Sequence, residues 1–176
     1  IPDSLTHEFK TAHGRSVRDG GGVKPDVEIK GREYSRLAYA LVLSGVIEHY
    51  TIEYCRAHES IAPVKDYHFD DYDGFIEFAK ASSFDARTSA MAAYDKMVED
   101  LRKDGLEDAL APELEALKAK LEMDKETFLR LKRDEITPLI EQEIASRYYF
   151  QKGSVEINLR YDNALRQALA SPRISY

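Results

Sequence analysis

Residues 37–47 read Leu-Ala-Tyr-Ala-Leu-Val-Leu-Ser-Gly-Val-Ile, which is the longest apolar stretch of the chain. The stretch is well short of the roughly 20 apolar residues that a membrane-spanning helix needs. It lies inside a longer run, residues 34–56, in which apolar residues recur at helical spacing. The first half of this run is apolar nearly all round the helix. We therefore expect one long helix, buried deep in the core, in which Ser44 and Gly45 let a neighbouring helix approach closely.

Start and stop signals predict two further helices in the middle of the chain. Asp70 is a natural N-cap for a helix that runs to about Ser82, with Phe75, Ile76, Phe78 and Ala79 buried. Asp85 or Thr88 would cap the next helix, which ends before Gly105 because glycine favours the residue after a helix. The apolar stripe expected on that helix consists of Met91, Tyr94, Met97, Val98 and Leu101.

The last third of the chain has the longest helical pattern. Pro112 suits a first helical turn, and leucines with Phe128 continue the stripe to Leu131. Thr137-Pro138 should kink or break the helix, because proline lacks a backbone donor. Gly153 predicts its end, and residues 155–159 fit either a short strand or a further helical turn. Asp162 would cap a final helix over residues 164–170 that Pro172 ends. The predicted fold class is mainly α.

Composition limits the function classes. The net charge is −7 and the pI near 5.3, so nucleic acid is not expected as the principal partner. Apolar residues make up 43% of the chain, enough for a packed core, and charged residues make up 32%. No stretch predicts a membrane span, and no pattern predicts a cofactor.

Four groups of residues deserve a functional interpretation beside a structural one. The only cysteine, Cys55, could share a helix face with His58, but we favour packing over a nucleophile. His68, Asp70, Asp71 and Asp73 could ligate a metal, but their spacing matches no EF-hand, and helix capping explains them better. The acidic run between Glu99 and Asp108 is interpreted as a solvated face.

The fourth group is the aromatic run Tyr148-Tyr149-Phe150. It fits either an exposed peptide-docking patch or packing between helices, and we favour packing. From these groups the sequence predicts no catalytic, cofactor-binding or metal-ligating residue.

The beginning of the chain has a different character. Residues 8–11 alternate polar and apolar side chains, His13-Gly14 fits a turn, and residues 15–18 fit a returning strand. Three glycines, residues 20–22, predict a loop, and the alternation at residues 27–30 predicts another short strand. A phosphate cradle is the alternative for the glycines, but the Lys-Ser/Thr ending of a P-loop is missing. An isolated hairpin is marginal, so Phe9, Val17 and Val23 should be covered by the helical domain or a neighbouring chain.

This segment carries a motif of the form Thr-x-x-Gly-Arg-x-(apolar), then glycines, an apolar residue and x-Pro-Asp. Its residues here are Thr11, Gly14, Arg15, Val17, Gly20, Gly21, Gly22, Val23, Pro25 and Asp26. The motif resembles the end of the catalytic core of the carboxy-terminal processing peptidases, which are serine proteases with a Ser/Lys dyad. Residues 143–153 also resemble the extreme C-terminal region of that family.

The resemblance implies that residues 1–30 are the edge of a peptidase core and that residues 33–176 are a helical accessory domain. The family's serine and lysine lie upstream of the motif, and neither context occurs in these 176 residues. We therefore expect this chain alone to be inactive, whereas its parent cleaves peptide bonds near substrate C-termini without a metal. The resemblance further implies a periplasmic, envelope-associated or secreted location. Expected partners are the upstream core, peptide substrates of the parent and another copy of the chain.

A second hypothesis remains open from the sequence. The helices could form a stand-alone protein–protein interaction module unrelated to any peptidase. That hypothesis leaves the match of the glycine-rich motif as a coincidence.

Overall fold

The computed structural model describes residues 5–12, 14, 16–20 and 27–170. The chain forms two compact units, Ile1–Gly31 and Arg32–Tyr176. The prediction of a mainly α fold with a short N-terminal hairpin is confirmed, since the described residues contain eight α-helices and one two-stranded sheet. The assignment of residues 1–30 to a peptidase core and of residues 33–176 to an accessory domain stays a prediction.

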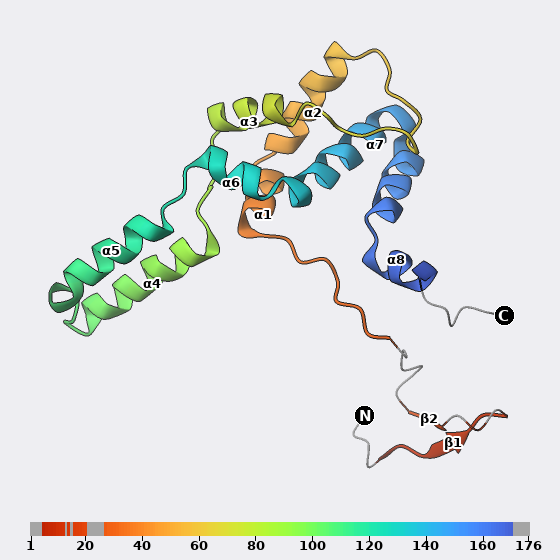
Figure 1. Ribbon diagram of the computed structural model, residues 1–176, viewed down its shortest axis with the longest axis horizontal. Helices are drawn as coiled ribbons and strands as arrows, with labels where there is room; N and C mark the ends of the chain where they lie inside the picture. The colour runs from red at the N-terminus through yellow and green to blue at the C-terminus, as the bar shows by residue number, and fades with distance from the viewer. Residues whose placement is uncertain (1–4, 13, 15, 21–26, 171–176) are drawn as a thin grey trace. The chain divides into compact units, whose positions relative to one another are not determined.

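The first unit contains the expected antiparallel hairpin (Figure 1). Strand β1 (Glu8–Lys10) pairs with β2 (Ser16–Arg18), and Phe9 lies opposite Val17. Gly14 closes the turn with a φ of 76°, which favours glycine, and its N–H donates to the carbonyl oxygen of Thr11 at 2.9 Å. The predicted turn and returning strand are thus present at the described positions, while His13 and Arg15 lie outside them.

The strand predicted at residues 27–30 is wrong, because these residues have no regular structure. Their alternation is a strand pattern, but a strand also needs a hydrogen-bonded neighbour, and none is described for them. Gly21, Gly22, Val23, Pro25 and Asp26 lie outside the described residues.

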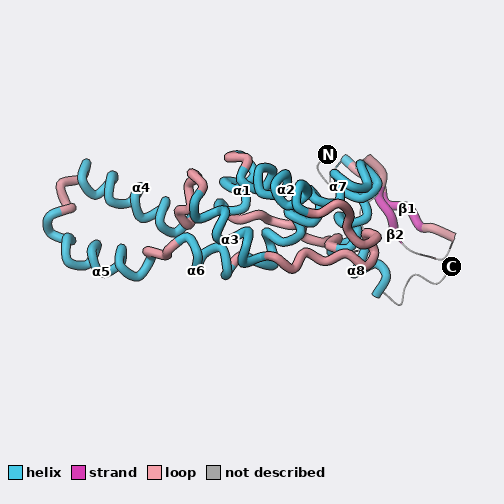
Figure 2. The backbone as a smooth tube through the Cα atoms, turned by 90° about the horizontal axis from the view of Figure 1, so that it is seen from above, coloured by secondary structure: helices cyan, strands magenta, loops and turns pink. Residues whose placement is uncertain are grey.

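The second unit is built from helices, whose arrangement Figures 1 and 2 show. The bounds are α1 (Arg36–Leu43), α2 (Val46–Ala57), α3 (Tyr72–Ala81), α4 (Ser89–Lys103), η2 (Asp108–Leu110), α5 (Ala111–Leu121), α6 (Lys125–Leu131), α7 (Arg133–Arg160) and α8 (Asn163–Ala170). Helix α2 packs on α7 and α3, and α6 packs on α3 and α7. None of the described helices is both long and apolar enough for a membrane crossing.

The long helix expected over residues 34–56 is two helices. Ser44 ends α1, and Gly45 adopts a left-handed conformation with a φ of 71°, so the backbone turns before α2 begins. Within the described part of the chain, the nearest atoms that an added Cβ at Gly45 would meet belong to His49, at 3.7 Å, and not to a closely packed neighbouring helix. The Ser-Gly pair therefore breaks the helix instead of admitting a neighbour.

The core lies between α1, α2, α3, α6 and α7. Ile136, Ile140 and Ile144 recur every fourth residue on α7 and are fully buried. Burial of such a side chain contributes about 1.5–3 kcal/mol. The ring of Tyr50 on α2 meets Phe75 of α3 edge to face at 5.2 Å, and its hydroxyl donates to the Asp71 carboxylate at 2.9 Å. Aromatic packing and one satisfied hydroxyl thus join α2 to α3.

The break in α7 is not at the expected proline. Helical geometry continues through Pro138, whereas Phe150 has φ 55° and ψ −150° and separates two helical halves. An added Cβ at Gly153 would lie 2.5 Å from the carbonyl oxygen of Ala145, so only glycine lets the two halves approach this closely. Residues 155–159 are helical, which decides between the strand and the helical turn.

A buried charge holds this bend. The carboxylate of Glu141, 1% exposed, accepts from Arg160 at 3.0 Å, from the Tyr161 hydroxyl at 2.9 Å and from the Phe69 N–H at 2.9 Å. Arg160 also donates to the carbonyl oxygen of Tyr67 at 2.8 Å. Glu141 therefore ties the two halves of α7 to the segment before α3, and each partner satisfies part of its buried charge.

Helices α4 and α5 form a separate pair that extends away from the other helices in both views (Figures 1 and 2). Asp162 caps α8 as expected, and Thr88, one of the two residues proposed for α4, caps that helix. The predicted long helix after Pro112 is instead interrupted at residues 122–124, because Asp124 caps a new helix, α6. The expected stripe of α4 has no fully buried member.

Candidate functional site

Cys55 and His58 do not form a nucleophilic pair. The Cys55 thiol is half-buried against the core, and burial raises its pKa, so the thiol stays protonated at neutral pH. The His58 ring stacks on Tyr54 with 4.0 Å between centroids, and its Nδ1 lies 2.8 Å from the Tyr54 carbonyl oxygen. Both residues therefore act as packing residues at the end of α2.

The acidic cluster before α3 caps and anchors helices. The N-cap is Asp71, not the expected Asp70, and its carboxylate accepts from the Gly74 N–H at 3.1 Å. Asp73 accepts from Arg130 of α6 at 2.8 Å, and His68 is exposed. Across the residues that the structure describes, no three or more His, Cys, Asp or Glu side chains gather as a metal site.

The aromatic run on α7 divides in two. The Tyr149 hydroxyl donates to the carbonyl oxygen of Ile61 at 3.1 Å, and the Tyr148 hydroxyl donates to that of His58. Burial raises the pKa of Tyr148 to about 12. Phe150 is 78% exposed at the bend. The packing interpretation is therefore correct for the two tyrosines and wrong for Phe150.

Helix α1 has two apolar faces, and the described residues of the helical unit cover only one of them. Leu37, Ala38 and Leu41 are buried in the core. Tyr39, Val42 and Leu43 are 57%, 52% and 84% exposed, and we call these three residues the α1 face. The expectation of a helix buried on all sides is wrong, because the unit supplies core on one side of α1 only. A contiguous exposed apolar patch of this kind is typical of a surface that contacts another protein.

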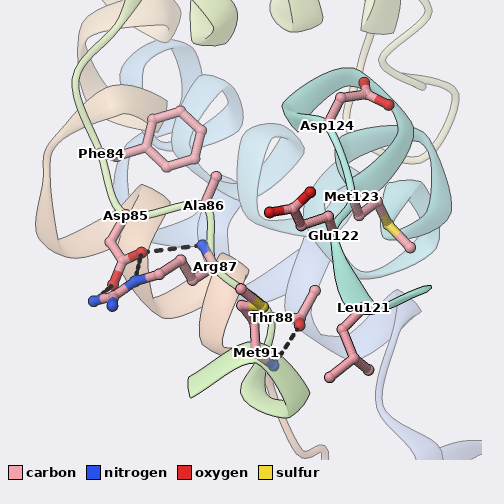
Figure 3. A pocket seen from close by; sticks show the side chains of 10 residues that line it. All are labelled: Phe84, Asp85, Ala86, Arg87, Thr88, Met91, Leu121, Glu122, Met123 and Asp124. Carbon is pink, nitrogen blue, oxygen red and sulfur yellow. Dashed lines mark hydrogen bonds and ion pairs between the residues drawn. The ribbon is translucent and has the colours of Figure 1, made fainter. Parts of the chain in front are cut away.

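A second feature is the junction between the α4–α5 pair and the rest of the unit. Two non-helical segments, residues 84–88 and 122–124, lie on opposite sides of an open pocket with a volume of about 630 Å³. Figure 3 shows Phe84 and Arg87 on one side of this pocket and Glu122 and Met123 on the other. The pocket lies where the pair joins the core, so its shape depends on the orientation of α4 and α5.

Ion pairs at the junction hold the segment of residues 84–88 in place. Asp85 accepts from Arg87 at 3.0 Å and from Arg36 of α1 at 2.8 Å. These two guanidinium groups hold the pKa of Asp85 well below its usual range. Within the pair, the Tyr94 hydroxyl donates to the carbonyl oxygen of Leu114 at 3.0 Å. The junction therefore combines a polar clamp with loosely packed apolar walls, and contains no group arranged as a nucleophile with its base.

Comparison with protein families decides what kind of helical unit this is. Residues 37–171 match the family described as "Probable PDZ-protease, C-terminal helical domain". The chain belongs to this family. The match runs from the second residue of α1 to just beyond α8, and therefore includes both the α1 face and the α4–α5 pair. No curated protein and no solved structure matches the chain.

This membership confirms the prediction of a helical domain from the C-terminal part of a protease, and it is consistent with the resemblance to the processing peptidases. It favours a non-catalytic part of a protease over a helical module unrelated to any peptidase. It also makes the protease core of the same protein the natural partner of these helices. Residues 1–36 precede the matched range.

Proposed function

We propose that this chain is the non-catalytic C-terminal region of a carboxy-terminal processing serine endopeptidase, whose helical domain docks on its own protease core through the α1 face. The parent would carry the Ser/Lys dyad upstream, outside the cytoplasm, and would need no metal. Family membership supports the protease, and the glycine-rich motif supports the processing class.

The uncovered face of α1 is the observation that carries this proposal. Leu43 is 84% exposed although it shares α1 with fully buried Leu41 and Leu37, and every residue of this helix after Arg36 is apolar. Transfer of three such side chains from water into an interface would contribute about 1.5–3 kcal/mol each. A surface helix of a complete fold normally has a polar outer side, so α1 has the composition of a helix buried on both sides.

The position of α1 in the sequence favours the protease core as the partner that covers the α1 face. Only residues 31–35 separate α1 from the segment that resembles the end of a peptidase core. A short tether raises the effective concentration of two surfaces to the millimolar range, so even a small apolar face can stay docked.

The N-terminal hairpin supports the same proposal independently. Its strands have three residues each, and the cross-strand pair Phe9 and Val17 is 55% and 39% exposed. A two-stranded sheet of this size is marginal in water and requires further strands or a covering surface. The cover predicted for Phe9 and Val17 stays a prediction, and Val23 lies outside the described residues.

Docked in this way, the helices would order the catalytic core, limit substrate entry or promote self-association. The α4–α5 pair would have a regulatory role if its orientation changes at the junction pocket, where two non-helical segments join it to the core. The chemistry would remain entirely in the parent's catalytic core.

The test compares Leu43→Asp with Leu169→Asp, since Leu169 is similarly exposed, at 77%, but belongs to a different helix, α8. In the isolated chain, both variants should keep the wild-type unfolding midpoint. In the complete protease, Leu43→Asp should expose the segment before α1 to limited trypsin cleavage and change the rate of peptide hydrolysis, whereas Leu169→Asp should do neither. Identical behaviour of the two variants in the complete protease would contradict the proposal.

A further inference from the structure

A pocket at the start of α7 gathers three arginines from distant parts of the helical unit. Arg32 precedes α1, Arg133 begins α7, and Arg166 lies on α8. The pocket has a volume of about 360 Å³, within the range of small-ligand sites. Asp134, Thr137 and Tyr161 contribute to its lining. This pocket is separate from the α1 face and from the junction pocket.

These three arginines differ from all other described arginines of the unit. Between residues 32 and 170 the chain has ten arginines, and seven of them form ion pairs with carboxylates. The paired ones are Arg36, Arg56, Arg87, Arg102, Arg130, Arg147 and Arg160. The remaining three are the three that line this pocket. In a chain with a net charge of −7, the described arginines of the helical unit that have no carboxylate partner are therefore all at one place.

Neutral groups hold these guanidinium groups in position. Pro138 has no N–H to donate to the Asp134 carbonyl oxygen, and Arg32 donates to that oxygen instead, at 3.1 Å. Arg32 also lies 5.7 Å from the centroid of the Tyr161 ring. Arg166 donates to the Asn163 side-chain oxygen at 2.8 Å. These contacts orient Arg32 and Arg166 without neutralising them, and each guanidinium has five N–H donors, so donors remain.

Arg133 is held in position by the aromatic ring of Tyr72. Its guanidinium carbon lies 5.1 Å from the centroid of Tyr72, which leaves the edges of the group available for hydrogen bonds. Thr137, one turn further along α7, has a buried hydroxyl that finds no hydrogen-bond partner among the described residues. A buried polar group without a partner is rare and indicates a missing one. The first N–H groups of the 28-residue helix α7 lie at the same end.

We propose that this pocket binds a carboxylate group. Guanidinium groups match the planar, two-oxygen geometry of a carboxylate, and the Thr137 hydroxyl would supply a further hydrogen bond. Asp134, the one acidic residue in the lining, opposes a doubly charged phosphate more than a singly charged carboxylate. Pro138 and the ring of Tyr161 provide an apolar wall for the carbon chain that bears the group. The carboxylate belongs to a small organic acid or to an acidic side chain of a peptide.

Calorimetric titrations of the chain at low ionic strength test this assignment. The probes are glutarate, an end-blocked hexaglutamate peptide, its hexaglutamine counterpart and inorganic phosphate. Glutarate binding identifies a small acid as sufficient, whereas binding of hexaglutamate without glutarate identifies a peptide as the source. Either result supports the proposal when hexaglutamine does not bind. Binding of phosphate alone, binding of hexaglutamine as tightly as hexaglutamate, or no binding of any probe overturns it.

Matched variants separate this pocket from general charge attraction. Arg133→Gln and Arg166→Gln should each weaken binding about tenfold or more, because each removes a charge-assisted hydrogen bond. Arg56→Gln removes the same charge from an exposed arginine that is paired with Glu53, and it should leave binding unchanged. Arg166→Lys keeps the positive charge but loses the two parallel N–H donors of the guanidinium group. This variant should therefore retain only part of the wild-type affinity. Equal losses in Arg56→Gln and Arg166→Gln, with unchanged circular dichroism, would overturn the proposal.

Discussion

The α7 core and the α4–α5 pair look alike as sequence patterns and differ as structures. Both have apolar residues at helical spacing, yet Ile136, Ile140 and Ile144 of α7 are fully buried, whereas α4 buries no residue and α5 buries only Leu114. A stripe shows which side of a helix is apolar, but the number of neighbouring helices decides how well that side is covered. Each helix of the pair packs mainly on the other, whereas α7 packs on both α2 and α6.

The two regions are consequently stabilised by different interactions. The core depends on apolar burial and on the buried Glu141 network, whereas α4 carries exposed ion pairs such as Lys103 with Glu99 at 2.6 Å. Exposed pairs contribute little, about 0–1 kcal/mol. Regions with few buried contacts open at a lower free energy than the molecule as a whole. The α4–α5 pair should therefore unfold locally while the core stays folded.

The largest expected effect comes from the buried charge. Glu141→Ala leaves the Arg160 guanidinium without its carboxylate partner and should lower the free energy of unfolding by about 3–5 kcal/mol. Urea denaturation followed by circular dichroism measures it. The control is Glu99→Ala in α4, which removes one exposed pair and should change the free energy by less than about 0.5 kcal/mol. Similar losses in the two variants would remove the distinction between core and pair.

Truncation of apolar side chains gives the next effect. Ile140→Ala in the core should cost about 2–5 kcal/mol of global stability, because the cavity that it creates is enclosed. Leu114→Ala should instead raise hydrogen exchange of the α4 and α5 amides while the global unfolding midpoint stays nearly constant. Hydrogen exchange of the two variants, followed by mass spectrometry, distinguishes global from local unfolding. A global loss in Leu114→Ala as large as that in Ile140→Ala would show that the pair and the core unfold together.

The smallest effect is expected at the junction and depends on pH. Arg87 and Arg36 lower the pKa of Asp85 in the folded state, so this carboxylate stabilises the fold above its unfolded pKa of about 4 and loses that contribution as the pH falls further. Its side chain is 37% exposed, and solvent screening keeps the effect below about 1 kcal/mol. Asp85→Asn should be less stable than wild type at pH 7, and the difference should shrink at pH 2.5 and in high salt. A constant difference across this range would show that the clamp is not electrostatic.

Several helix starts were predictable to within a few residues from the side chains that can cap a helix. Asp162 caps α8 as expected, and of the two residues proposed for α4 the structure selects Thr88. Each supplies an oxygen to the free N–H groups of the next turn. Asp70 and Asp71 are chemically identical neighbours, and only the position of the chain against Tyr50 decides that Asp71 caps α3. Asp124 looked like an interruption of a stripe but acts as the cap of a new helix.

The bend of α7 was not predictable from its residues. Pro138 is the strongest helix breaker in the stretch, yet α7 continues because Arg32, distant in sequence, donates to the carbonyl oxygen that the proline leaves free. The bend falls at Phe150, a residue with no local preference for a positive φ. The pocket of three arginines was missed for the same reason, since Arg32, Arg133 and Arg166 share no sequence pattern. A search for arginines without an acidic residue three or four positions away would have found only Arg133 of the three, because Glu28 and Asp162 lie four positions before Arg32 and Arg166.

By itself, the sequence determined that the chain is mainly helical, where several helices begin, and that its glycine-rich start resembles the edge of a protease core. These are local properties, set by spacing, capping and turn residues within a few positions of each other. Only the tertiary structure decided that α1 keeps an apolar face open, that α7 bends at Phe150 and that three arginines meet in one pocket. Those features depend on contacts between residues far apart in the chain, and the coverage that such contacts provide is not encoded in any single helix.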